Sequence, residues 1–144
     1  MNIPNCDKID CIIQRNWMNS CDEVTIFING IELRKIIKDI EREYIGAEEQ
    51  KRSSEAYGYM TPKQLYNELI KNYNDEFGAG VFCCPSCGEI PCAGLYVYIR
   101  NDEKYTYWYK FENFCYENLI YNISFKFLND EYNNFLNKLK SNIS

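Results

Sequence analysis

The stretch "AGLYVYIRNDEKYTYWYKF", residues 93–111, decides the fold class. Side chains that favour the core alternate with tyrosines and charged residues in both of its halves, and four polar residues lie between the halves. Strict alternation over this length is typical of strands that bury one face. The pattern predicts that residues 95–100 pair antiparallel with residues 105–111. One face of this hairpin is expected to carry Leu95, Val97 and Ile99, together with Trp108 on the partner strand.

The same alternation predicts the register of the hairpin and the content of its other face. A turn centred between Asp102 and Glu103 places Tyr98 opposite Tyr107. Five tyrosines then share the second face: Tyr96, Tyr98, Tyr105, Tyr107 and Tyr109. Aromatic sheet faces sometimes stack nucleic-acid bases. Cross-strand aromatic pairs under helices or at a protein interface are the interpretation we favour.

Helical spacing of apolar residues predicts helices before and after the hairpin. One helix is expected from about Ile31 to Gly46, with Asn29 as its N-cap. A second follows Thr61, a good N-cap, with Pro62 at the first helical position. A third is expected at the C-terminus, where its apolar stripe follows a capping asparagine: Asn129, Tyr132, Phe135, Leu136 and Leu139.

Two further strands are expected, over residues 24–28 and 119–127, because β-branched and aromatic residues are enriched there. Residues 1–23 show no clean period and are interpreted as an irregular N-terminal arm. The order of strand, two helices, three strands and helix predicts an α+β fold. We expect a single domain over residues 1–144, with a mostly antiparallel sheet of about four strands and three helices packed on it.

Charge and composition exclude several classes of function. The chain has 144 residues, a net charge of −5 and no histidine. Catalytic sites that need histidine, such as Ser-His-Asp and Cys-His arrangements, cannot be built from it. The acidic balance argues against nucleic-acid binding. No secretory leader or membrane span is recognisable, so we expect a cytoplasmic protein with mostly reduced thiols.

A cysteine cluster, "VFCCPSCGEIPC" at residues 81–92, is the clearest chemical motif. Its C-P-x-C-G core resembles a zinc knuckle, because two thiolates two residues apart can grip one ion. The ligands expected for such a zinc site are Cys84, Cys87, Cys92 and Cys115. Two alternatives remain open. The thiols could simply pack in the core, or Cys84 and Cys87 could form a thiol-disulfide redox pair.

Short motifs between residues 24 and 140 resemble an uncharacterised bacterial family of small cytosolic α+β proteins. They are Ile28-Asn29-Gly30-Ile31-Glu32-Leu33 at a helix start, Cys87-Gly88-Glu89 with Cys92 before a strand, Trp108, and Phe125-x-Phe127 followed by Tyr132 and Leu136. The chain departs from that pattern in its C-x-x-C spacing and at Pro91. The resemblance supports the architecture and implies no reaction.

The leading hypothesis from the sequence is a non-enzymatic cytoplasmic protein. Its expected role is protein interaction, with a protein partner or as a homo-oligomer, and without nucleic acid or membrane. The cysteine cluster is expected to form a structural loop that could hold zinc. The alternative is a thiol-disulfide redox enzyme that uses Cys84 and Cys87.

Overall fold

The computed structural model describes residues 6–17, 20–45, 57–71, 78–83, 90, 94–113 and 119–143. Strands and helices alternate irregularly along the chain. Their order is β1 (Ile9–Asn16), β2 (Cys21–Ile28), β3 (Ile31–Glu32), α1 (Leu33–Ile45), α3 (Pro62–Ile70), β4 (Ala79–Phe82), β5 (Leu95–Asn101), β6 (Tyr105–Glu112), β7 (Phe125–Leu128) and α5 (Asn129–Ser141).

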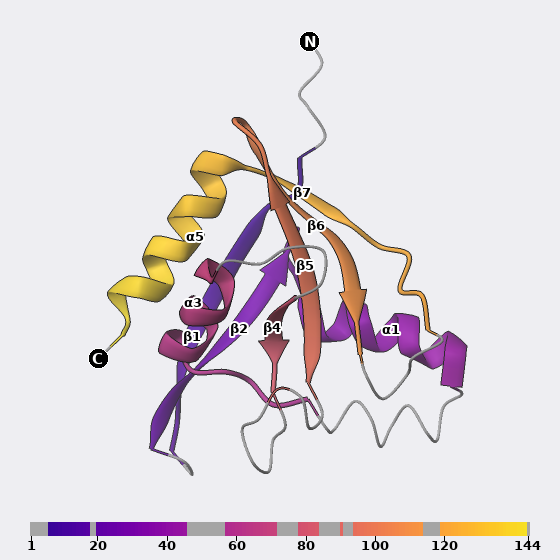
Figure 1. The fold of residues 1–144 in the computed structure, drawn as a ribbon. Coiled ribbons are helices and arrows are strands. Elements are labelled where there is room, and N and C mark those ends of the chain that lie inside the picture. The colour runs from indigo at the N-terminus through magenta and orange to yellow at the C-terminus, as the bar shows by residue number, and fades with distance from the viewer. Residues whose placement is uncertain are drawn as a thin grey trace.

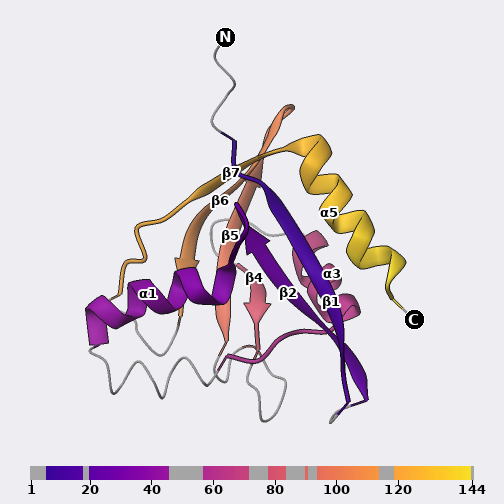
Figure 2. The same cartoon turned by 180° about the vertical axis from the view of Figure 1, so that it is seen from behind.

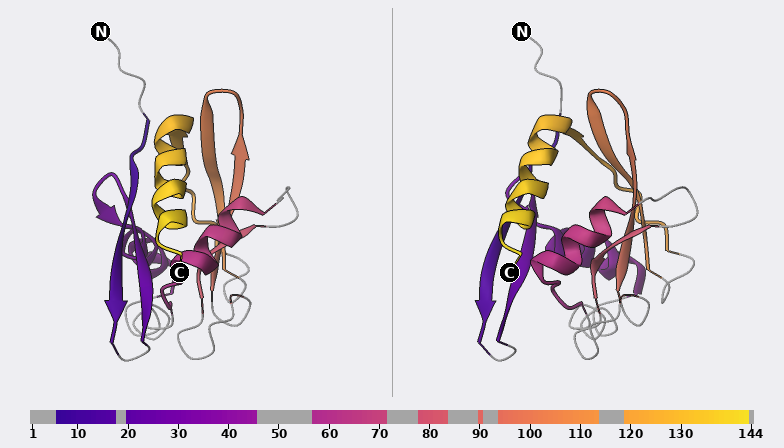
Figure 3. Two further views of the ribbon diagram at one scale, coloured as in Figure 1. Left: turned by 90° about the vertical axis from the view of Figure 1, so that its left-hand side faces the viewer. Right: turned by 60° about the vertical axis from the view of Figure 1, so that its left-hand side comes forward.

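The strands form two antiparallel sheets, where the sequence predicted one. The four-stranded sheet β4-β5-β6-β7 matches the prediction, and the order β1-β2-β3 makes a second sheet that faces it (Figures 1 and 2). Helices α3 and α5 close one side of the space between the sheets (Figure 3), and α1 lies on the opposite side. The α+β class is therefore confirmed, and the single sheet is corrected to two.

Backbone hydrogen bonds link the two sheets on both sides. On one side the N–H of Asp7 donates to the carbonyl of Lys126 in β7, at 2.7 Å. On the other side a segment over residues 57–60 accepts a bond of 2.9 Å from the N–H of Val24 and pairs with Cys83. The core thus lies between two sheets whose edges are joined. Within the described residues, no helix is long and apolar enough to span a membrane.

The core is built around Trp108, which the alternation placed on the same face as Leu95, Val97 and Ile99. Its side chain is fully buried on the inner face of β6. The rings of Phe127 and Tyr132 meet it edge-on, with centroids 5.5 and 6.3 Å away. The indole N–H donates to the hydroxyl of Tyr132 at 3.2 Å. This contact joins the sheet to α5, which buries Tyr132 and Phe135 on the same face.

The β5–β6 hairpin is antiparallel, as predicted, but its predicted register is wrong. Arg100 lies opposite Tyr107, and Tyr98 lies opposite Lys110. Two features explain the difference. The carboxylate of Asp102 accepts hydrogen bonds from the backbone N–H groups two and three residues later, which moves the turn along the chain. A bulge after Tyr98 then adds one residue on β6.

The N-terminal part of the chain also differs from the prediction. Residues 1–23 were expected to be irregular, yet β1 runs over Ile9–Asn16 and pairs with β2 along its whole length. Asn29 and Gly30 have φ values of 54° and 80° and form the β2–β3 turn. Left-handed geometry at both positions is the geometry of a tight hairpin turn. Asn29 is therefore not a helix cap, and α1 begins only at Leu33.

The predicted N-cap of α3 is confirmed, and the predicted N-cap of α5 is wrong. Thr61 caps α3 as predicted, because its hydroxyl accepts a hydrogen bond of 3.2 Å from the N–H of Gln64. Asn129 is the first residue of α5 and not its cap. Its side chain instead accepts from the hydroxyl of Thr106 and donates to the carbonyl of Asp102. The start of α5 is thereby tied to the β5–β6 hairpin.

Candidate protein-interaction groove

Strand β6 has an open edge over half of its length. Strand β7 pairs only with residues 105–108 of β6. On that side, none of the strands in the described ranges pairs with residues 110–112, although β5 pairs with them on the other side. The sequence predicted a strand over residues 119–127, but its first half is not in the sheet. Asn122 has a φ of 51°, a left-handed conformation that interrupts an extended strand.

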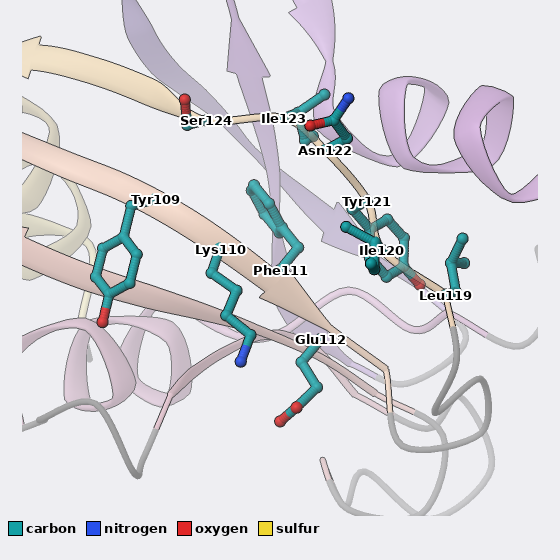
Figure 4. A pocket seen from close by; sticks show the side chains of 10 residues that line it. All are labelled: Tyr109, Lys110, Phe111, Glu112, Leu119, Ile120, Tyr121, Asn122, Ile123 and Ser124. Carbon is teal, nitrogen blue, oxygen red and sulfur yellow. The ribbon is translucent and has the colours of Figure 1, made fainter.

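A cavity of about 470 Å³ lies beside the segment that leads into β7. Residues 109–112 of β6 form one wall and residues 119–124 form the other (Figure 4). We call this cavity the open-edge groove. Phe111 and Tyr121 are both buried beneath it, with ring centroids 6.5 Å apart. Ile120 lines the opposite wall and is 83% exposed, so the groove combines an aromatic floor with an apolar rim.

Two opposite charges stand on the β6 wall of the open-edge groove. In Figure 4, Lys110 and Glu112 point to one side of β6 and Phe111 points to the other. The ammonium of Lys110 lies 4.8 Å from the ring centroid of Tyr98. The carboxylate of Glu112 accepts a hydrogen bond of 2.8 Å from the hydroxyl of the same tyrosine. Burial and this bond raise the pKa of Tyr98 to about 12. One tyrosine therefore positions both charges.

A second cavity of about 400 Å³ adjoins the first along the sheet. The two cavities share Tyr109 and Ser124. Arg100 also lines the second cavity and lies 4.7 Å from the ring centroid of Tyr109. The described cations on this face sit over tyrosine rings, as Lys126 does over Tyr105 at 4.5 Å. The tyrosine face is thus partly covered by basic side chains, which the sequence interpretation did not foresee.

A buried polar network supports the floor of the open-edge groove. Glu41 of α1 is fully buried. Its Oε2 atom accepts hydrogen bonds from the hydroxyls of Tyr57 and Tyr121, the latter at 2.8 Å. The side-chain amide of Asn113 donates to the hydroxyl of Tyr57 at 2.6 Å. Within the part of the chain that the structure describes, Oε1 of Glu41 has no hydrogen-bond partner. The network therefore joins α1 to the wall that carries Tyr121.

The sequence offered one signal for this network, and the sequence interpretation missed it. Tyr44 follows Ile36, Ile37 and Ile40 at helical spacing in the sequence, yet its side chain is half-exposed. The buried face instead runs through Leu33, Ile37 and Glu41, at successive intervals of four residues. Glu41 thus occupies a core position by helical spacing alone. Burial raises its pKa, and the bonds from the two tyrosines only partly oppose that change.

Glu41→Gln should flatten the pH dependence of stability. The native pKa of Glu41 lies above its ordinary value of 4.5, so the native state disfavours the charged form. The protonated carboxyl of Glu41 contributes fully to stability at pH values below its ordinary pKa of 4.5. This contribution is lost as pH rises through the raised native pKa. The amide keeps an acceptor oxygen and carries no charge. We therefore expect Glu41→Gln to lose less stability than the wild type as pH rises, because the amide has no charged form to bury.

The measurement is urea denaturation at about pH 5 and about pH 8, followed by circular dichroism. Glu43→Gln is the matched control, because Glu43 is an exposed residue of the same helix. It should shift stability by less than about 0.5 kcal/mol at either pH. Equal pH dependence in the wild type and in Glu41→Gln would contradict the raised pKa.

The predicted zinc ligands all lie outside the described residues: Cys84, Cys87, Cys92 and Cys115. Zinc binding and the redox pair therefore stay predictions. Of the other cysteines, Cys83 is buried with its sulfur 3.6 Å from the carbonyl of Gly58. Burial raises the pKa of Cys11 to about 11, so this thiol keeps its proton. Among the residues that the structure describes, no group of three or more Cys, Asp or Glu is placed to hold a metal ion.

Ile90, between the cysteines of the cluster, is described and packs onto the four-stranded sheet. The N–H of Gly94 donates to its carbonyl at 2.8 Å. A Cβ added at Gly80 of β4 would lie 2.4 Å from Cδ1 of Ile90. A Cβ at Gly94 would lie 2.4 Å from the carbonyl oxygen of Phe82. Both glycines are therefore needed for this close approach.

No protein-family model, curated protein or solved structure matches this chain. The resemblance found in the short sequence motifs stays a prediction. What the chain can do must therefore be argued from its own geometry. The open-edge groove is the feature with the most specific geometry, because it combines an open strand edge, an aromatic floor and two positioned charges.

Proposed function

We propose that this chain is a non-enzymatic protein-interaction module that binds an extended segment of a partner protein along the open edge of β6. One observation carries the proposal: on the side of β6 that faces away from β5, residues 110–112 pair with no strand of the described chain, and a cavity of about 470 Å³ lies beside them. A strand edge presents N–H and C=O groups that another chain can pair with. Binding by strand addition is a common mode of peptide recognition.

The chemistry of the open-edge groove supports a protein partner. Phe111 and Tyr121 offer an aromatic floor on which an apolar side chain of the partner can pack. Ile120 at the rim is among the most exposed large apolar side chains of the described chain. An exposed apolar side chain beside an open strand edge is typical of an interaction site. An extended peptide can pair its backbone with the open edge of β6 and pack an apolar side chain on the aromatic floor.

Charge argues against nucleic acid as the partner. The groove wall carries one cation and one anion, Lys110 and Glu112, and the chain as a whole has a net charge of −5. Nucleic-acid sites gather several basic groups that face phosphates. Arg100 and Lys126 lie over tyrosine rings, so stacking bases would compete with them for these rings. The free thiols of Cys6, Cys11 and Cys21 fit the cytoplasmic location that we propose.

The test is selection of peptides from a displayed library of random nonapeptides on the purified protein. Peptides that bind should slow hydrogen exchange at those backbone amides of residues 110–112 that point away from β5, because a peptide strand would pair with them. They should bind Ile120→Arg at least about tenfold more weakly, since a charge replaces apolar contact at the rim. Trp17→Arg is the matched control, because Trp17 is also 83% exposed and lies at the far end of β1.

Selected peptides should bind Trp17→Arg as tightly as the wild type. If they bind Ile120→Arg equally well, or protect amides elsewhere, the proposed site is wrong. Because both substituted side chains are exposed, neither variant is expected to lose the fold.

A further inference from the structure

We infer that the partner segment carries a basic residue, an apolar residue and an acidic residue in that order, and that it pairs antiparallel to β6. This inference rests on the proposed function and specifies the ligand of the same groove. In the paired state, the basic residue lies opposite Glu112, the apolar residue opposite Phe111 and the acidic residue opposite Lys110.

Alternation along β6 sets the spacing of the triplet. Lys110 and Glu112 point to one side of the strand and Phe111 points to the other (Figure 4). An added strand alternates with the same period of two, so residues opposite each other share a face. A partner strand therefore places its first and third residues beside the two charges. Its middle residue points to the aromatic floor formed by Phe111 and Tyr121.

Charge sets the identity of the outer residues. Opposite charges directly across an antiparallel pair are favourable, and like charges are unfavourable. The two charges of β6 are held by Tyr98, which contacts the ammonium of Lys110 and donates to Glu112. A partner with the complementary charges meets groups that are already positioned, so little side-chain entropy remains to be lost.

Direction decides the order of the charges along the partner. Each strand pair described in the two sheets is antiparallel. The open edge continues the line along which β7 pairs antiparallel with residues 105–108. Antiparallel pairing is also slightly more stable per residue than parallel pairing. An antiparallel segment meets Glu112 first and Lys110 last, so its basic residue precedes its acidic residue.

Two labelled heptapeptides of the same composition test the inference: Ser-Thr-Lys-Val-Glu-Thr-Ser and Ser-Thr-Glu-Val-Lys-Thr-Ser. Their binding to the full chain is measured by fluorescence anisotropy at low salt, where exposed charge pairs are least screened. The lysine-first peptide should bind about threefold to tenfold more tightly, because two favourable pairs replace two unfavourable ones. The charge-swapped double variant Lys110→Glu, Glu112→Lys should reverse this preference by a similar factor.

The outcomes separate the inference from the proposed function. Equal binding of both peptides, or tighter binding of the glutamate-first peptide, would overturn the inference while the groove still binds extended peptides. Binding of neither peptide would overturn both. Two lysine-first peptides, N-methylated at the valine or at the glutamate that follows it, are the backbone controls. N–H groups of successive residues in a strand point to opposite sides, so one of the two peptides should lose binding and the other should keep it. Retained binding of both, with an unchanged charge preference, would place the peptide on the groove without strand pairing, and would also overturn the inference.

Discussion

Replacing Trp108 with alanine should lower the free energy of unfolding by about 3–5 kcal/mol. The indole is fully buried and has aromatic neighbours on β6, β7 and α5. Alanine would leave a cavity between the sheet and the helix, and the surrounding rings can relax into it only in part. It would also remove the donor that bonds the hydroxyl of Tyr132. A loss of this size is a large share of the stability of a typical domain.

The chain supplies a matched control, because it has only two tryptophans. Trp17 is 83% exposed, so Trp17→Ala should change stability by less than about 0.5 kcal/mol. Urea denaturation followed by circular dichroism measures both variants by the same signal. In Trp17→Ala, Trp108 becomes the single indole, and its fluorescence should report a buried environment until unfolding. Equal stability of the two variants would show that Trp108 does not organise the core.

Alanine at Gly80 or Gly94 should cost about 1–3 kcal/mol each, because either Cβ would overlap existing atoms. The atoms that it meets differ between the two sites. At Gly80 the three nearest atoms belong to the side chain of Ile90, at 2.4, 2.9 and 3.0 Å. At Gly94 the two nearest are backbone oxygens, of Phe82 at 2.4 Å and of Ile90 at 2.5 Å. A side chain can be shortened by mutation, and a carbonyl group cannot.

A double-mutant cycle with Ile90→Ala distinguishes the two sites. Gly80→Ala combined with Ile90→Ala should be more stable than the sum of the single effects, by about 1 kcal/mol or more. Gly94→Ala should show a much smaller coupling, since its overlap with the backbone remains. Urea denaturation of the single and double variants measures both cycles. Similar coupling at both glycines would mean that the backbone around Phe82 moves to make room.

The elements that the sequence predicted are those with a local signal. Alternation grouped Trp108 with Leu95, Val97 and Ile99 on one face, which the structure buries. Thr61 with Pro62 marked the start of α3. The signal at Asn29-Gly30 was also local, but a helical pattern directly after it favoured a cap over a hairpin turn. Local patterns thus identified the fold class, and competing local patterns caused the error at this turn.

The two-sheet arrangement and the open-edge groove depend on contacts between distant residues. Strand β4 is only four residues long and fully buried, so no alternation marks it. The groove exists because residues 119–124, which precede β7, lie outside the sheet. The left-handed conformation of Asn122 in this segment has no reliable sequence signature. The role of Glu41 was not predicted, because its partners, Tyr57 and Tyr121, lie 16 and 80 residues away along the chain.

The joining of the two sheets also bears on the order in which the chain can fold. The carboxylate of Asp7 accepts a hydrogen bond from the N–H of Lys126, 119 residues later, and the backbone bond between them spans the same distance. β1 can pair with β2 as soon as both have been synthesised, because their hairpin is local. The bonds that join Asp7, just before β1, to β7 must wait until residues 125–128 have been synthesised. Contacts of such long separation slow folding. Strand β1 can therefore pair with β2 early, and its link to the other sheet forms late.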